Sequence, residues 1–188
     1  MQKIRTFVAI PVSPEVQKRA ADLIKRLSAS DANVNWVHPD RLHMTLKFLG
    51  DVPNTEVSQV CQAVARAAAN RRPFTVTYEG VGVFPNRDRP RVMWIGVEDG
   101  MEPLTDLQES VDQNLRTLGF PPERRRFHAH LTVGRLRRSV ASKALRDLID
   151  QNEGYSAGIA NVSELLVMAS FLDKSGPTYD VMARFQLT

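Results

Sequence analysis

Apolar residues recur at helical spacing in four segments of the chain. In the first of these, the apolar positions fall three or four residues apart behind Ser13, a residue type that caps helices, and Pro14 occupies the first helical position. Gly119 follows the third segment and is typical of a helix end. The pattern therefore predicts helices over residues 14–27, 54–69, 102–118 and 142–148.

Shorter runs in which apolar residues alternate or follow one another predict strands over residues 5–10, 43–49, 74–81, 92–97, 131–134, 162–170 and 179–187. Gly50 is expected to end the second of these strands, and the turn-rich residues 82–90 separate the two central ones. Helices mixed with consecutive strands predict an α+β fold with partly antiparallel sheets. Since no linker rich in proline, glycine or serine divides the chain, residues 1–188 are expected to form a single domain.

Composition narrows the class of protein. The chain has one cysteine, Cys61, in an alanine-rich helical segment, so it has no intrachain disulfide and the thiol is interpreted as a small apolar side chain. The apolar run near the N-terminus is too short for a signal peptide, and no segment approaches the length of a membrane span. These features predict a cytoplasmic, soluble protein that makes no contact with a membrane, and we expect a monomer.

Arginine dominates the basic residues and is clustered. The net charge is only +4, but 19 of the 25 basic residues are arginine. Arginine binds phosphate oxygens through two parallel hydrogen bonds, whereas lysine acts as a point charge. A solvated, arginine-rich surface remains the alternative to phosphate binding. The clusters are Arg87, Arg89 and Arg91, followed by Arg124, Arg125, Arg126, Arg135, Arg137 and Arg138.

A short sequence pattern occurs twice. Residues 43–46 (HMTL) resemble residues 130–133 (HLTV), and each copy follows a loop and precedes a helix by a few residues. This repeat suggests two similar lobes. Because side chains of a strand alternate between its faces, each copy should place its histidine and threonine on one face. The predicted site faces hold His43, Thr45 and Lys47, and His128, His130 and Thr132; the predicted core faces hold Leu42, Met44, Leu46 and Phe48, and Ala129, Leu131 and Val133.

Two such histidines supply what phosphodiester hydrolysis requires. One imidazole removes a proton from water, a second imidazolium protonates the leaving oxygen, and hydroxyl groups bind the phosphoryl oxygens. Histidine suits both roles because its unperturbed pKa of about 6.5 populates both protonation states near neutrality. The residues leave two alternatives open. His43, His128 and His130 could bind a catalytic metal, although such sites often include a carboxylate and neither motif contains one, or the arginine clusters could serve a non-catalytic RNA-binding module.

Residues 43–50 (HMTLKFLG) and 128–135 (HAHLTVGR) resemble the two signature motifs of the two-histidine phosphoesterase superfamily, specifically its LigT-like branch, the RNA 2′,3′-cyclic phosphodiesterases (ThpR). The resemblance covers nearly the whole chain. Val133 stands where the family often has leucine, which is a conservative departure. Further matching segments are residues 5–10, 36–37, 82–85 and 91–94.

The resemblance implies a bilobal α+β fold in which two antiparallel sheets surround a central cleft with helices outside. It also implies hydrolysis of a 2′,3′-cyclic phosphate on RNA ends or nucleotides to a 2′-phosphate, with no metal and no cofactor. By motif match, His43 would be the general acid that protonates O3′ and His130 the general base for water. Thr45 and Thr132 would bind the non-bridging oxygens. Some members also join RNA ends through a 2′,5′ linkage, which would be secondary for this protein.

Three further residues are candidates for the site. Arg135 has the wrong strand parity to face the site with His130, so it reaches phosphate only if Gly134 ends or bulges the strand. His128 has the right parity and would position His130 or contact substrate. Phe84, in a turn-rich segment, could stack on a base, with core packing as the alternative.

Overall fold

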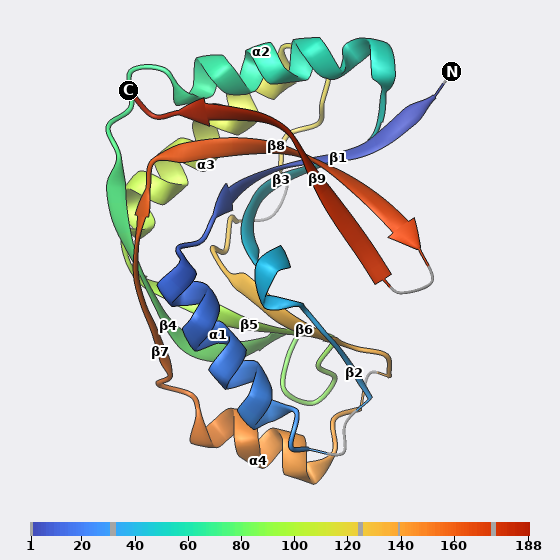
Figure 1. The fold of residues 1–188 in the computed structure, drawn as a ribbon, viewed down its shortest axis with the longest axis vertical. Helices are drawn as coiled ribbons and strands as arrows, with labels where there is room; N and C mark the ends of the chain where they lie inside the picture. The colour runs from blue at the N-terminus through green and yellow to red at the C-terminus, as the bar shows by residue number, and fades with distance from the viewer. Residues whose placement is uncertain (1, 31–32, 124–125, 139, 174–175) are drawn as a thin grey trace.

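Two antiparallel sheets form the centre of the molecule, and helices cover their outer faces (Figure 1). The computed structural model describes residues 2–30, 33–123, 126–138, 140–173 and 176–188. The first sheet has the strand order β3–β1–β8–β9, from His43–Pro53, Lys3–Pro11, Glu164–Asp173 and Gly176–Gln186. The second has the order β2–β6–β5–β4–β7, from Val34–Trp36, Leu131–Leu136, Val92–Asp99, Phe74–Phe84 and Ser156–Val162. The predicted α+β class with antiparallel sheets is confirmed.

Helices pack against both sheets. Helices α2 (Val57–Ala68) and α3 (Met101–Arg116) contact the first sheet, α1 (Pro14–Leu27) contacts the second, and α4 (Lys143–Gln151) contacts α1 (Figure 1). Local sequence explains where they start: the side chains of Ser13 and Ser142 each accept a backbone N–H at the helix N-terminus. Each helix then buries one apolar face; in α1 this face is Val16, Ala20, Leu23 and Leu27. None of the helices described is long and apolar enough to cross a membrane.

The chain builds the same arrangement twice. Strand β1, helix α1, strand β3 and helix α2 are followed by strand β5, helix α3, strand β6 and helix α4, and a histidine motif opens the second strand of each set. Each half also contributes a strand to the sheet that contains the other half's strands. Strand β4 from the first half lies beside β5 in the second sheet, whereas β8 from the second half lies beside β1 in the first sheet. The short sequence repeat therefore reflects two structurally similar halves.

Several predicted boundaries are wrong. Strands β2 and β7 were not predicted, and β3 does not end at Gly50 but continues to Pro53. Gly50 can lie inside the strand because its φ of +73° is readily adopted by glycine, and the β1–β3 register skips Leu49 at this point. Strand β4 extends to Phe84 and β6 to Leu136, further than their apolar runs indicated.

A second bulge in β3 reverses the predicted faces of two residues. Ala9 pairs with Thr45 and Val8 pairs with Lys47, so Leu46 is an extra residue in β3. Lys47 is consequently buried on the helix side of the sheet, and Phe48 is exposed on the side of His43. Placing Lys47 with His43 and Thr45, and Phe48 in the core, was wrong because alternation holds only in an uninterrupted strand.

Candidate active site

Each of the two motif histidines makes the same type of hydrogen bond, from Nδ1 to a backbone carbonyl two residues earlier. His43 is the first residue of β3, and His130 directly precedes β6. The Nδ1 of His43 lies 2.8 Å from the carbonyl oxygen of Arg41, and the Nδ1 of His130 lies 2.7 Å from that of His128. Because a carbonyl oxygen only accepts, each Nδ1 carries the proton that it donates, and in the neutral ring Nε2 keeps a free lone pair. Both imidazoles are therefore oriented for proton transfer through Nε2.

The strands of the two motifs belong to different sheets and contact each other. Strand β3 contacts β6, and β2, which precedes the first motif, pairs with β6. The N–H of Val37 also donates to the carbonyl of Val133 at 2.9 Å. A Cβ on Gly134 would lie 2.9 Å from side-chain atoms of Trp36 and Val34, so glycine at this position permits the close approach of β2. The loop before one motif is thus attached directly to the strand of the other.

Burial lowers the pKa of both histidines. For His43 and His130 the largest cause is loss of hydration, which disfavours the imidazolium, and the hydrogen bond to the backbone carbonyl opposes it. The positive charge of Arg135 lowers the pKa of both rings further, and His128 adds to this effect at His130. Arg135 therefore lies close enough to act on both rings. An anion bound beside this arginine would raise both pKa values, so anion binding and histidine protonation are coupled.

The strand bulges just before Arg135, which is the condition under which this residue was expected to reach the site. Met93 pairs with Gly134 and Trp94 with Thr132, which leaves Val133 as the extra residue. Side chains 128–133 follow the predicted alternation, and after the bulge Arg135 is exposed while Leu136 is buried. The same bulge follows the threonine of the first motif, where Phe48 takes the place that Arg135 has in the second.

Thr45 and Thr132 have corresponding environments. Each is half-buried, lies two residues after its histidine and precedes the bulge. Neither hydroxyl makes a hydrogen bond to any residue within the described ranges, so both are available to a ligand.

Aromatic side chains surround each histidine. Around His130, the ring of Phe84 lies 5.0 Å away, nearly perpendicular, and Trp94 and His128 complete the group. Around His43, the ring of Phe7 lies at 4.9 Å and that of Tyr179 at 5.0 Å. The predicted candidates Phe84 and His128 thus both contact His130. The contacts of Phe7, Tyr179 and Trp94 with the histidines were not predicted, because each residue comes from a strand whose partner the local sequence does not specify.

The other arginines have different surroundings. Arg87 donates to Asp150 at 2.6 Å and to Glu153 at 2.8 Å, and Arg137 donates to Asn35 at 2.8 Å. Arg124 and Arg125 lie outside the described residues. Within the described ranges, Arg135 is the arginine whose charge acts on both histidines.

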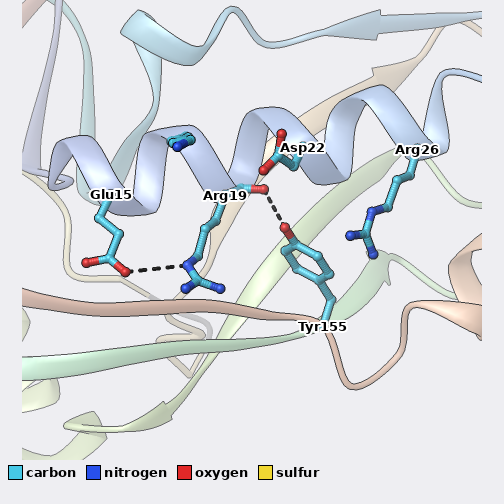
Figure 2. A pocket seen from close by; sticks show the side chains of 6 residues that line it. Glu15, Arg19, Asp22, Arg26 and Tyr155 are labelled. Atoms are coloured by element: carbon cyan, nitrogen blue, oxygen red, sulfur yellow. Dashed lines mark hydrogen bonds and ion pairs between the residues drawn. The ribbon is translucent and has the colours of Figure 1, made fainter.

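A hollow of about 350 Å³ lies elsewhere, beside α1 (Figure 2). Arg19 pairs with Glu15 at 3.5 Å, and Arg26 lies 5.2 Å from the ring centre of Tyr155. The Tyr155 hydroxyl donates to the carbonyl of Arg19 at 2.7 Å. Figure 2 shows these side chains crossing the hollow, which contains none of the motif residues. In the described part of the chain, no group of three or more histidine, cysteine, aspartate or glutamate side chains is placed to hold a metal ion.

Comparison with known proteins places this geometry in a family. The model of the LigT-like phosphoesterases matches residues 10–94 and, separately, residues 95–179, in agreement with the two similar halves. The RNA 2′,3′-cyclic phosphodiesterase of Methanothermobacter thermautotrophicus is 36% identical over 98% of this chain and 100% of its own length. The corresponding Aquifex aeolicus protein is 32% identical over 100% of this chain and 99% of its own.

Solved structures show the same architecture. TT0787 of Thermus thermophilus superposes with a TM-score of 0.83 at 26% identity, covering 98% of both chains. E. coli LigT complexed with 3′-AMP superposes with a TM-score of 0.80 at 23% identity, covering 100% of this chain and 99% of that one, which supports the fold. From the double family match and these full-length likenesses, the chain belongs to the LigT-like phosphoesterase family.

Proposed function

We propose that this chain is a single-domain enzyme that hydrolyses a 2′,3′-cyclic phosphate, at an RNA end or on a nucleotide, to a 2′-phosphate without a metal ion. The observation that carries the proposal is the matched pair of imidazoles, each held by an Nδ1 hydrogen bond to a backbone carbonyl, with no partner for Nε2 among the described residues. The names of full-length relatives, RNA 2′,3′-cyclic phosphodiesterases at 36% and 32% identity, support the substrate class.

The two histidines take opposite roles in one displacement at phosphorus. His130 accepts a proton from water at Nε2 as the water oxygen forms a bond to phosphorus. His43 donates a proton from Nε2 to O3′ as the bond between phosphorus and O3′ breaks. The phosphate remains bonded to O2′. Transfer of one proton from His130 to solvent and of another from solvent to His43 restores the enzyme.

The remaining site residues act on the phosphate. The hydroxyls of Thr45 and Thr132, which have no protein partner within the described ranges, donate to the non-bridging oxygens. Arg135 supplies the positive charge that balances the developing charge on those oxygens. Because Arg135 lowers the pKa of both histidines in the free enzyme, the substrate anion reverses this effect and allows His43 to be protonated when substrate is bound.

A related reaction, in which a 5′-hydroxyl instead of water attacks the cyclic phosphate and O3′ leaves to give a 2′,5′ linkage, would use the same acid–base pair. We regard such ligation as secondary, and we expect the chain to act as a monomer on substrates in solution.

A single incubation tests the proposal. Purified protein is mixed, in excess EDTA, with an oligonucleotide ending in a 2′,3′-cyclic phosphate, and the product phosphate is identified by ³¹P NMR. A 2′-phosphate formed at the same rate with and without EDTA is expected, and the H43A/H130A double variant should be about as slow as the poorer single variant. Loss of turnover in EDTA with recovery on Zn²⁺ or Mn²⁺ would establish a metal enzyme instead. Binding without turnover would leave an RNA-binding module, and a 3′-phosphate would reverse the proposed orientation of substrate.

A further inference from the structure

Arg41 is held at the border of the active site, on the side of His43. It ends the short 3₁₀ helix Pro39–Arg41, and its backbone carbonyl accepts the hydrogen bond from Nδ1 of His43 at 2.8 Å. Its guanidinium group donates to the backbone carbonyl of Pro177, near the start of β9, at 3.0 Å. The backbone of this residue therefore orients the proposed acid, while its side chain is fixed against another strand.

The start of β9 borders the same histidine. The ring of Tyr179 lies 5.0 Å from that of His43. Pro177 precedes Tyr179 by two residues, and two residues of a strand span about 7 Å. This length is comparable to the spacing of neighbouring phosphates along a nucleic-acid strand. An arginine bound to Pro177 is therefore suited to the phosphate next to the one that reacts at His43.

The second motif has a side chain at the border of the site in the same position. His128 stands two residues before His130, and its backbone carbonyl accepts the corresponding hydrogen bond at 2.7 Å. The centres of the two imidazole rings are 6.2 Å apart. The first motif carries a permanent cation at this position, in Arg41.

The charge of Arg41 is not paired with any carboxylate of the described residues. The neighbouring Asp40 lies against His38 instead, with 3.4 Å between a carboxylate oxygen and Nδ1. A guanidinium group has five N–H donors, and the bond to Pro177 is the only hydrogen bond from this side chain within the described ranges. A half-buried arginine that is fixed at one donor is prepared for two parallel hydrogen bonds to a phosphate.

The direction of the reaction decides which part of the substrate lies here. In an in-line displacement, the attacking and leaving oxygens are on opposite sides of phosphorus. Under the proposed function His130 activates water and His43 protonates O3′, so the ribose lies on the side of His43. Because O2′ and O3′ of this ribose carry the cyclic phosphate, the RNA chain continues only through O5′. The next group along the chain is a phosphodiester with a negative charge.

We propose that the side chain of Arg41 binds the phosphate attached to O5′ of the terminal nucleotide, an inference that rests on the proposed function. A nucleoside 2′,3′-cyclic phosphate has a hydroxyl group at this position and cannot make the contact. Arg41 therefore makes the enzyme favour the ends of RNA chains over free nucleoside cyclic phosphates. Because a phosphate contact carries no sequence information, this preference does not depend on the bases.

The test compares substrates that differ only at O5′. We measure kcat/KM for adenosine 2′,3′-cyclic phosphate, for the same compound with a 5′-phosphate, and for the dinucleotide ApA ending in a 2′,3′-cyclic phosphate. The wild-type protein should prefer both phosphorylated substrates by roughly 10- to 150-fold, the value of a hydrogen-bonded charge pair. R41Q keeps a donor for the Pro177 carbonyl but removes the charge, so it should lose this preference, and R41K should keep part of it. Any effect on His43 changes all three rates and cancels in their ratios.

Salt and a second arginine provide the controls. In the wild-type protein, kcat/KM should fall more steeply with ionic strength for ApA than for the nucleoside substrate, and this difference should disappear in R41Q. The matched control is R5Q. Arg5 is an exposed arginine on the same face of β1 as Phe7, and it lies opposite Asp51 in the pairing of β1 with β3. R5Q should keep the wild-type ratios.

Three outcomes would overturn the assignment of Arg41 while the enzyme remains active. They are unchanged ratios in R41Q, a loss confined to the dinucleotide, which would assign the contact to the preceding nucleoside, and a loss in R5Q as large as in R41Q. If the wild-type protein hydrolyses none of the substrates, the proposed function fails, and calorimetry with adenosine 2′,5′-bisphosphate and adenosine 2′-monophosphate then decides about Arg41. Weaker binding of the bisphosphate alone by R41Q supports the contact, and an unchanged ratio of the two affinities overturns it.

Discussion

Removing one member of the buried pair of Lys47 and Asp112 should be strongly destabilising, and it gives the sharpest test of the β3 bulge. Lys47 is 4% exposed and Asp112 13% exposed, and the carboxylate also accepts the N–H of Glu123 at 3.2 Å. D112A leaves the ammonium group buried with the carbonyl of Pro121 as its remaining partner. Leaving one member of such a pair uncompensated costs about 3–5 kcal/mol.

This cost is large enough to measure by thermal unfolding. For a chain of this size, about 1 kcal/mol of lost stability lowers Tm by roughly 2–4 °C, so D112A should lower Tm by roughly 6–20 °C. The matched control is D147A on α4, which removes an exposed pair whose lysine and aspartate are 82% and 48% exposed. Exposed pairs contribute less than about 1 kcal/mol, so this variant should lose at most about 4 °C.

A double substitution separates the charge from the packing. In K47M/D112L both charges are replaced by apolar groups of similar size, and the Pro121 carbonyl, on an exposed residue, can bind water instead. Such replacements are often neutral, so Tm should return to within a few degrees of the wild-type value. If K47M/D112L is as unstable as D112A, or if D147A is equally damaging, the reasoning from an uncompensated buried charge is wrong.

Three further predictions concern catalysis. H43A and H130A should each lower kcat by roughly 10²- to 10⁴-fold with unchanged circular dichroism. The double variant should be little worse than the poorer single one. Near-wild-type turnover in either folded variant would contradict the pairing of the two histidines. Valine in place of the threonine of either motif should reduce kcat by about 10²-fold and leave the pH profile in place, so a shifted profile would assign the hydroxyl another role. R135Q removes the charge that lowers the pKa of both histidines, so the base stays protonated to higher pH and the acid also keeps its proton to higher pH. Both limbs of the kcat/KM profile should therefore move to higher pH in R135Q, but not in the control R138Q, and a shift in the opposite direction would contradict the electrostatic assignment.

The sequence predicted the helices because their determinants are local. The 3.6-residue period and the capping side chains of Ser13 and Ser142 lie within the segments that they define. Strands β2 and β7 were missed for the converse reason. Val34–Trp36 has only three residues, and the small residues of Ser156–Val162 carry little strand propensity, so pairing with β6 and β4 forms these strands.

The candidate site was predictable only as far as the motifs extend. The histidines and threonines occur in two similar segments, so their common face follows from strand alternation. Bulges interrupt that alternation, and whether a strand bulges depends on its partner strand, which lies far away in sequence. This explains why Lys47 and Phe48 were placed on the wrong faces, whereas the role of Arg135 could be stated only as conditional on a bulge.

The bulges also bear on the question of which histidine is the acid and which is the base. His43 and His130 make the same hydrogen bond, and burial shifts the pKa of both in the same direction, so their immediate surroundings do not decide which is the acid and which the base. A reaction that needs one of each must obtain its asymmetry from other residues. The two halves differ at the residue that follows each bulge, which is Phe48 in one and Arg135 in the other. Under the proposed function the nucleoside binds on the side of His43, so O3′ lies beside that histidine, and its role as the acid follows from where the nucleoside binds.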